Sequence, residues 1–200
     1  MDGPLKQPNL TMRKPLHTLA DIRIGHSFRG GITNDPAGDV RVLQIKDIKG
    51  QDALDASGLP RIVWESSSAP PLLAAGDVVI AGRGEHHHAA IADGHDKIVP
   101  TSLFLVLRVR GKTVAPEYLR WYLNQPAARI YFHENRTGSN IPMLSKQALG
   151  ELPVAVPSMQ AQQEIVALHR LSQDERRLTE QLLRNREMML SGIWQRLLES

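Results

Sequence analysis

The side chains best suited to chemistry gather in one histidine-rich stretch, "GEHHHAAIADGH", at residues 84–95. Imidazole nitrogens bind Zn²⁺, but three or four ligands must reach one ion. Because neighbouring residues point in different directions, a metal site would need His86 and His88 on one strand face, with Glu85 or His95 nearby. A polar loop whose imidazoles touch phosphates or bases is the simpler interpretation. A histidine-dependent metalloenzyme is kept as an alternative.

The rest of the sequence offers no catalytic centre. There is no cysteine, which excludes disulfides, thiolate metal sites and cysteine nucleophiles. No glycine-rich stretch has the G-x-x-x-x-G-K-[ST] or G-x-G-x-x-G spacing that holds nucleotide phosphates. The G-x-S-x-G nucleophile elbow and a nuclease-like set of carboxylates with a lysine are also missing. We therefore expect a protein that is not an enzyme and that holds no metal.

Three segments set an arginine beside glycine or small polar residues. Arg29 lies in "FRGG" (28–31), Arg83 in "AGRGEH" (81–86) and Arg136 in "HENRTGSNIPML" (133–144). Glycine lets a backbone approach a phosphate closely, and guanidinium and amide groups can pair with base edges in the major groove of DNA. The segments indicate contacts with nucleic acid, and ordinary surface turns are the alternative.

Composition narrows the class of protein. The chain of 200 residues is 42% hydrophobic and 22% charged, as expected for a globular domain with an appendage. Residues 159–200 carry six Lys and Arg and six Asp and Glu, so the net charge of +3 comes from residues 1–158. No apolar run approaches the ~18 residues of a membrane span. With no secretory segment and no cysteine, we expect a cytoplasmic protein.

Short strands must position these loops. The alternating or β-branched stretches at 38–48, 61–64, 76–84 and 102–111 predict strands, with Arg108 and Arg110 opposite the leucine face of the last one. Residues 115–134 predict a helix that Pro126 kinks or splits. A loop, a short helix and a strand with Val154 and Val156 follow. The pattern predicts a mixed α/β or α+β body.

A long helix is predicted from Ser158, its N-cap, to the C-terminus. About 40 helical residues span roughly 60 Å, more than such a body. The helix carries an apolar stripe that predicts pairing with another helix, in this chain or in a second copy. The alternative is that the helix packs back on its own body. The stripe comprises Ile165, Leu168, Leu171, Leu178, Leu182 and Met189.

Several stretches follow one another in the order seen in a known family. They are "LADIRIGHSFRGG", "VLQIKDIKG", "LLAAGDVVIAGRG", "TSLFLVLRVRGKTVAPEYLRWYLNQP" and, most specifically, "GSNIPMLSKQALGELPVAVPSMQAQQEIV". Over about residues 18–198 the chain resembles one half of a DNA-specificity subunit of type I restriction-modification systems. The family's apolar-Pro-apolar-Pro entry into a long helix is matched by Leu152, Pro153, Val156, Pro157, Met159, Gln162 and Ile165.

The resemblance implies an organisation and a set of partners. Residues 1–17 would be an N-terminal tail, 18–157 a target recognition domain, and 158–200 a coiled-coil helix that acts as spacer and docking surface. The partners would be double-stranded DNA, a methyltransferase subunit with S-adenosylmethionine and, where a restriction complex forms, a restriction subunit with ATP and Mg²⁺. This chain itself would bind no cofactor.

Two departures from the family bear on this expectation. Specificity subunits typically carry two such units in tandem, and this chain carries one. It also has Ser158-Met159 and Ala161-Gln162 where the family often has Pro-Leu and Glu-Gln. We therefore expect a homodimer, joined by antiparallel C-terminal helices, that reads an inverted and split target. The alternative is a coiled-coil interaction module without DNA binding. The expected DNA contacts are Arg29, Lys46, Arg83, His87, Arg136 and Asn140.

Overall fold

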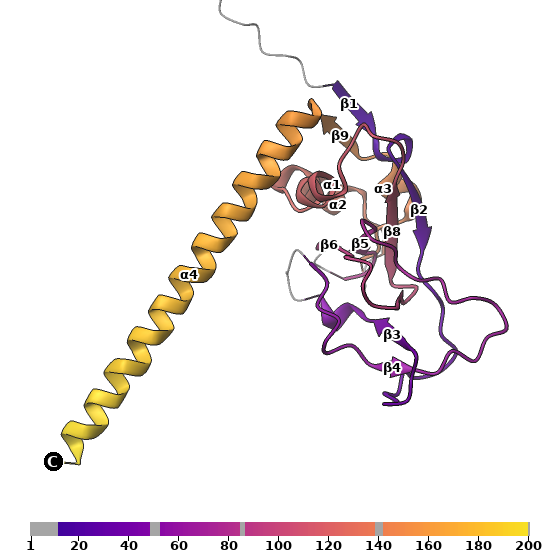
Figure 1. The fold of residues 1–200 in the computed structure, drawn as a ribbon. Coiled ribbons are helices and arrows are strands. Elements are labelled where there is room, and N and C mark those ends of the chain that lie inside the picture. The colour runs from indigo at the N-terminus through magenta and orange to yellow at the C-terminus, as the bar shows by residue number, and fades with distance from the viewer. Residues whose placement is uncertain (1–11, 49–52, 85–86, 139–141, 200) are drawn as a thin grey trace, which may run out of the picture. The chain divides into compact units, whose positions relative to one another are not determined.

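The computed structural model describes residues 12–48, 53–84, 87–138 and 142–199. The chain divides into two compact units, Met1–Gln162 and Gln163–Ser200. We call the first unit the body. The mixed α+β body followed by a long C-terminal helix confirms the fold class that the sequence predicts (Figure 1).

The central sheet of the body has four antiparallel strands. In spatial order they are β2 (Ala20–Ile24), β8 (Phe104–Val109), β5 (Val78–Ala81) and β6 (Ala89–Ile91) (Figure 1). All of Phe104–Leu107 in β8 is buried, and Phe104 and Val106 belong to a core cluster that includes Leu43 and Ile98 of a second sheet. The predicted division into a leucine face and an arginine face therefore holds only from Arg108 onward.

A second sheet consists of three short strands in the order β4 (Arg61–Ile62), β3 (Val40–Leu43) and β7 (Ile98–Pro100). The predicted strand at 38–48 ends early, because Gln44 begins a 3-10 helix, η2 (Ile45–Asp47). The Gln44 N–H donates to Asp47 Oδ2 at 2.9 Å and closes this capping box. Buried side chains from both sheets, including Leu43, Val79, Ile98 and Phe104, share one core cluster.

The first described residues form a third, two-stranded sheet. Strand β1 (Met12–Pro15) pairs antiparallel with β9 (Pro153–Val156), and the 3-10 helix η1 (Leu16–Thr18) follows it. Leu16 is fully buried. The prediction of an N-terminal tail over residues 1–17 is therefore wrong from Met12 onward. Local sequence patterns could not reveal this strand, because its partner lies more than 130 residues away in the sequence.

Three helices complete the body, namely α1 (Pro116–Leu123), α2 (Pro126–Asn135) and α3 (Lys146–Gly150). Pro116 and Pro126 each stand in a first turn, where a proline costs no hydrogen bond. The predicted split of the 115–134 helix at Pro126 is confirmed. The hydroxyls of Tyr118 and Tyr122 donate to the carbonyls of Ala155 and Pro153 at 2.8 Å, which ties α1 to β9.

Helix α4 (Met159–Leu198) begins where the sequence predicts, since the Ala161 N–H donates to Ser158 Oγ at 3.3 Å. Its first turn is held within the body by Gln162, which is fully buried. The Gln162 amide accepts from Ala115 N–H and donates to the carbonyls of Thr113 and Pro157, each at 2.9 Å. The boundary between the units consequently follows Gln162 and not Pro157.

Candidate nucleic-acid interface

The segment Thr101–Leu103, which leads into β8, is the meeting point of loops from several strands. The His26 N–H, after β2, donates to Pro100 O at 2.7 Å, and His26 bridges Thr101. The Thr101 N–H donates to Leu43 O at the end of β3 at 3.1 Å. The Gly82 N–H, after β5, donates to Leu103 O at 2.8 Å. The loops that carry Arg29, Lys46 and Arg83 therefore all begin beside the segment Thr101–Leu103.

The third predicted arginine loop joins the same region. Met143 forms antiparallel bridges with both Arg83 and Thr137, the residue after Arg136. The Leu144 N–H donates to Gly82 O at 2.8 Å, and the Gly84 N–H donates to Pro142 O at 3.0 Å. Segment 82–84 therefore lies beside residues 142–144, which are more than 50 residues away in the sequence and which in turn lie beside Thr137.

A groove of about 310 Å³ lies beside these segments. Its lining includes Arg83, Lys146 and Ser102, and no carboxylate among the lining residues that the structure describes. Two apolar side chains in the lining, Ile24 and Met143, are 58% and 40% exposed. Cations beside exposed apolar groups suit a partner with phosphates and flat or methyl-bearing bases. Sequence analysis did not single out Lys146, because nothing in its local pattern sets it apart from an ordinary helix residue.

Two further predicted contact residues are exposed on this side of the fold. Arg29 follows Phe28, whose ring lies 4.8 Å from the ring of His26, and that ring in turn lies 4.9 Å from Trp64. Lys46 is exposed on η2. Asn140 lies outside the described residues. The structure therefore brings together the loops of Arg29, Lys46, Arg83 and Arg136.

His87 does not fit the predicted role. It is only 8% exposed, and its Nδ1 donates to Ala81 O at 2.7 Å. Its ring packs edge-on against Phe132 with 5.8 Å between ring centres. A side chain held in the core in this way cannot reach DNA, so the expected contact by His87 is wrong.

The metal alternative gains no support from the geometry. Across residues 12–48, 53–84, 87–138 and 142–199, no group of three His, Asp or Glu side chains is placed to hold a metal ion. Glu85 and His86, which that alternative requires, lie outside these ranges.

At the opposite end of the central sheet, arginines are neutralised by carboxylates. Asp77, which is 1% exposed, accepts from Nε and Nη2 of Arg108 at 2.7 Å and from the Ala74 N–H at 2.9 Å. Burial opposes ionisation of Asp77, but the hydrogen bonds from Arg108 and Ala74 outweigh it and lower the pKa of this carboxyl. Arg23 lies 3.4 Å from the same carboxylate.

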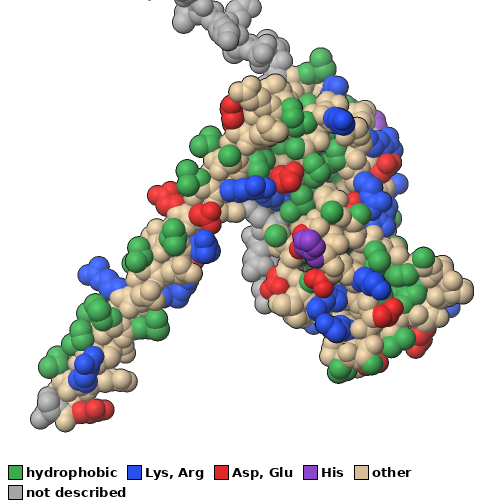
Figure 2. All heavy atoms as spheres, viewed as in Figure 1, with side chains coloured by type: hydrophobic (Ala, Val, Ile, Leu, Met, Phe, Trp, Pro, Cys, Tyr) green, Lys and Arg blue, Asp and Glu red, His purple; other side chains and the backbone are tan. Residues whose placement is uncertain are grey.

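A second, exposed ion pair joins Asp21 and Arg110 across β2 and β8. The hydrogen bond from Arg110 lowers the pKa of Asp21. Figure 2 shows Lys and Arg side chains along the margin of the body over β2. Since Arg108 and Arg110 are already paired, this margin is less able to attract phosphates than its number of arginines suggests.

The second unit is a helix with an exposed apolar stripe. Hydrophobic side chains occur along α4, interleaved with charged ones (Figure 2). The predicted pairing residues Leu168, Leu171, Leu178, Leu182 and Met189 are 53–70% exposed, while Ile165 is half-buried. Exposed leucines at heptad spacing are typical of a helix that pairs with another.

No helix in the described ranges is long and apolar enough to cross a membrane.

Comparison by sequence finds no matching family model and no matching curated protein. Comparison by structure finds clear likenesses. The HsdS subunit from Thermoanaerobacter tengcongensis superposes with a TM-score of 0.62 at 20% identity, over 86% of this chain and 40% of that one. The S subunit of a type I restriction-modification system from M. genitalium gives 0.58 at 13% identity, over 85% and 41%.

A third chain comes from a structure that addresses complex assembly and conformational transition of the type I R-M system. It gives a TM-score of 0.63 at 20% identity, over 86% of this chain and 40% of that one. This chain thus spans about two fifths of the length of the proteins it matches. At these identities the likeness is one of fold, and this chain has the fold of part of a type I restriction-modification S subunit.

Proposed function

We propose that this chain is a non-catalytic specificity protein that reads double-stranded DNA. The observation that carries the proposal is the convergence of the loops of Arg29, Lys46, Arg83 and Arg136 around Thr101–Leu103. Four cation-bearing loops at one end of a sheet can follow a phosphate backbone while loop side chains enter a groove. The fold, shared with S subunits of type I systems, supports the same function.

The proposal extends to a homodimer built through α4. Exposed Leu178 and Leu182 would pack against the same stripe of a second copy in antiparallel orientation. A dimer with two-fold symmetry presents one reading surface for each half of an inverted, split target.

Other subunits would supply the chemistry. A methyltransferase subunit that uses S-adenosylmethionine would dock on the dimer, joined in a full complex by an ATP- and Mg²⁺-dependent restriction subunit. This chain would contribute the position on DNA and no catalytic group.

Binding to duplex DNA at two salt concentrations tests the proposal. Four phosphate contacts predict a roughly hundred-fold loss of affinity between 50 and 200 mM salt. Fluorescence anisotropy with a labelled pool of random duplexes, with and without the methyltransferase partner, measures it. If no binding occurs at 50 mM salt under either condition, the proposal is wrong.

A second function is supported by one specific observation. Charges on residues 159–200 cancel, and the stripe on α4 is exposed, so the helix is suited to bind protein whether or not the body binds DNA. In a coiled-coil interaction module without DNA binding, the anisotropy would stay flat while the chain still self-associates.

A further inference from the structure

The segment that follows β5 is one strand of a small antiparallel ribbon that extends beyond the central sheet. Main-chain hydrogen bonds of the neighbouring residues flank Arg83 and Met143, so these two residues lie opposite each other without exchanging a bond. Met143 and Thr137 exchange both of their main-chain hydrogen bonds, at 2.8 and 2.9 Å. Met143 is therefore the middle residue of a row that Arg83 and Thr137 complete on either side.

The three side chains of this row share one face of the ribbon. Directly opposite residues in an antiparallel pair point the same way, with Cα atoms ~4.5 Å apart where no bond is exchanged and ~5.5 Å apart where both bonds are. The row is therefore about 10 Å long. Arg83, Met143 and Thr137 are all exposed, whereas the adjacent Gly82 and Leu144 are buried. The ribbon thus turns one face to the core and presents the row to solvent.

The row offers a cation beside an apolar side chain. No ion pair joins Arg83 to another described residue, whereas Arg41 and Arg108 are held by Asp96 and Asp77. The neighbouring Met143 side chain is 40% exposed. Both Arg83 and Met143 line the groove of about 310 Å³, whose described lining includes no carboxylate. The row is therefore suited to a ligand that combines acceptor groups with an apolar group.

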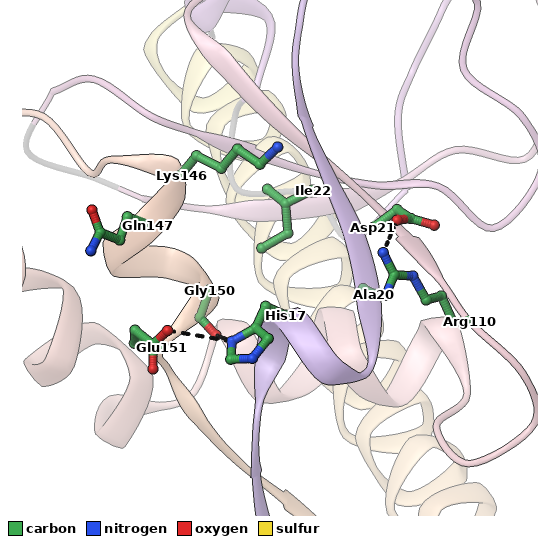
Figure 3. Close-up of a pocket in the computed structure, with 9 residues that line it drawn as sticks. All are labelled: His17, Ala20, Asp21, Ile22, Arg110, Lys146, Gln147, Gly150 and Glu151. Atoms are coloured by element: carbon green, nitrogen blue, oxygen red, sulfur yellow. Dashed lines mark hydrogen bonds and ion pairs between the residues drawn. The ribbon is translucent and has the colours of Figure 1, made fainter.

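The larger cavity of the body is less suited to DNA. It has a volume of about 430 Å³, and two carboxylates, those of Asp21 and Glu151, belong to its lining. Figure 3 shows Asp21 against Arg110 and Glu151 against His17, whose Nδ1 lies 3.4 Å from Glu151 Oε1. Carboxylates repel phosphates, so the exposed row of the ribbon is the better candidate for reading bases.

We propose that this ribbon enters the major groove of the DNA target, where Arg83, Met143 and Thr137 are specificity-determining residues that read a guanine, a neighbouring thymine and the base pair beyond it. The inference rests on the proposed DNA binding and names the base edges that this part of the surface recognises. The major groove is ~12 Å wide and admits a two-stranded β-ribbon, so a row about 10 Å long fits within it.

Each side chain of the row matches one kind of base edge. The guanidinium of Arg83 can donate two hydrogen bonds to O6 and N7 of guanine, and the apolar side chain of Met143 can pack on the C5-methyl group of thymine. The hydroxyl of Thr137 both donates and accepts, so it can bond to the pair beyond the thymine. Neighbouring base pairs are ~3.4 Å apart, which long side chains from adjacent positions of the row can span.

Base analogues test the two main contacts in the native chain. Duplexes that the native chain selects from a random library supply the target. Deoxyuridine in place of the predicted thymine removes only its methyl group, and 7-deazaguanine in place of the guanine removes only the N7 acceptor. We expect the affinity to fall about four-fold with the first analogue and about ten-fold with the second.

Each variant should remove one of these effects and leave the other. Met143→Ala should bind the thymine and uracil duplexes with equal affinity and still discriminate against 7-deazaguanine, and Arg83→Ala should do the reverse. Met143→Leu keeps an apolar contact and should keep the preference for thymine. Ile130→Ala removes a side chain that is 58% exposed on α2, outside the ribbon, and is the matched control. Thr137→Val should relax selection at the pair beyond the thymine.

The outcomes separate this inference from the proposed function. If the native chain selects a target but no exchange of thymine for uracil weakens binding, the inference is overturned and DNA binding stands. The same holds if Met143→Ala keeps the full preference for thymine. If the native chain binds no duplex, the proposed function is wrong and this inference is wrong with it. The measurements with analogues need only the native chain, so they decide even if a variant fails to fold.

Discussion

Gly25 lies so close to Thr101 that a Cβ at position 25 would come within 2.1 Å of the Thr101 carbonyl oxygen. The clashing atoms belong to backbone, which cannot swing away as a side chain can. Only glycine allows the end of β2 to meet the segment that leads into β8. The position of the Arg29 loop, which follows β2, therefore depends on this contact.

Gly25→Ala should lower the free energy of unfolding by about 1–3 kcal/mol, because the methyl group forces two backbone segments apart. Chemical denaturation measures the change. Gly31→Ala is the matched control, since nothing lies within 4 Å of a Cβ there and it should be nearly neutral. Equal stability of the Gly25→Ala and native proteins would contradict the contact.

Arg83→Ala should weaken binding to a target duplex by about 1–3 kcal/mol if Arg83 contacts a base edge. Arg83 is exposed on the segment beside Thr137 and Met143. Lys112→Ala, beyond the other end of β8, removes the same unit charge and should have a smaller effect. Anisotropy titrations at one salt concentration compare the two variants. Equal losses of DNA affinity would mean that the effect does not depend on where on the body the positive charge is removed.

Replacing Leu178 and Leu182 with glutamate should abolish self-association, because charges would face each other in the centre of the apolar stripe. Sedimentation velocity at micromolar concentration should show a dimer for the native chain and a monomer for the variant. Gln173→Glu adds a charge on the opposite face of α4 and should stay dimeric. An unchanged dimer in the double variant would place the interface elsewhere.

Acid should destabilise the body through Asp77. The pKa of Asp77 is lower in the folded protein than its ordinary value of 3.8. The ion pair with Arg108 therefore contributes fully above that value, and its contribution is lost as the pH falls through the folded-state pKa. Asp77→Asn should lower the free energy of unfolding at neutral pH by about 1–3 kcal/mol. It should also reduce the further decrease of this free energy as the pH falls below about 4.

Asp21→Asn is the control for that pH profile. Asp21 also has a lowered pKa beside Arg110, but the pair is exposed to solvent. Exposed ion pairs contribute little to stability. Between pH 2.5 and 7, the stability of Asp21→Asn should follow that of the native protein, whereas the stability of Asp77→Asn should depart from it. If instead Asp21→Asn departs and Asp77→Asn follows the native protein, the role of Asp77 is refuted.

Elements whose signals are local could be predicted from the sequence. Pro116 and Pro126 mark the starts of α1 and α2, and Ser158 marks the start of α4, because a proline in a first turn and a capping hydroxyl act on neighbouring residues. Strand β1 could not be predicted in this way, since it pairs with β9, which lies more than 130 residues away in the sequence. The burial of β8 at Phe104 and Val106 likewise depends on distant residues, since their core cluster includes Leu43 and Ile98 of the second sheet.

The candidate site also combines features that local sequence signals predict with features that they do not. Glycine next to arginine correctly indicated loops at Arg29 and Arg83, but not that these loops meet, because bonds through Thr101, Leu103 and Met143 bring them together. His87 was mispredicted because a histidine in a polar stretch can still turn inward to Ala81 and Phe132. Gln162 matched a family position, yet its three hydrogen bonds required the structure.

Selection of duplexes from a random library by the full-length chain, followed by sequencing, tests the central claim most directly. The account predicts enrichment of two short half-sites in inverted orientation, separated by a fixed number of unselected base pairs, and a complex of two chains per duplex. Enrichment of a single half-site, or of no sequence at all, would contradict it.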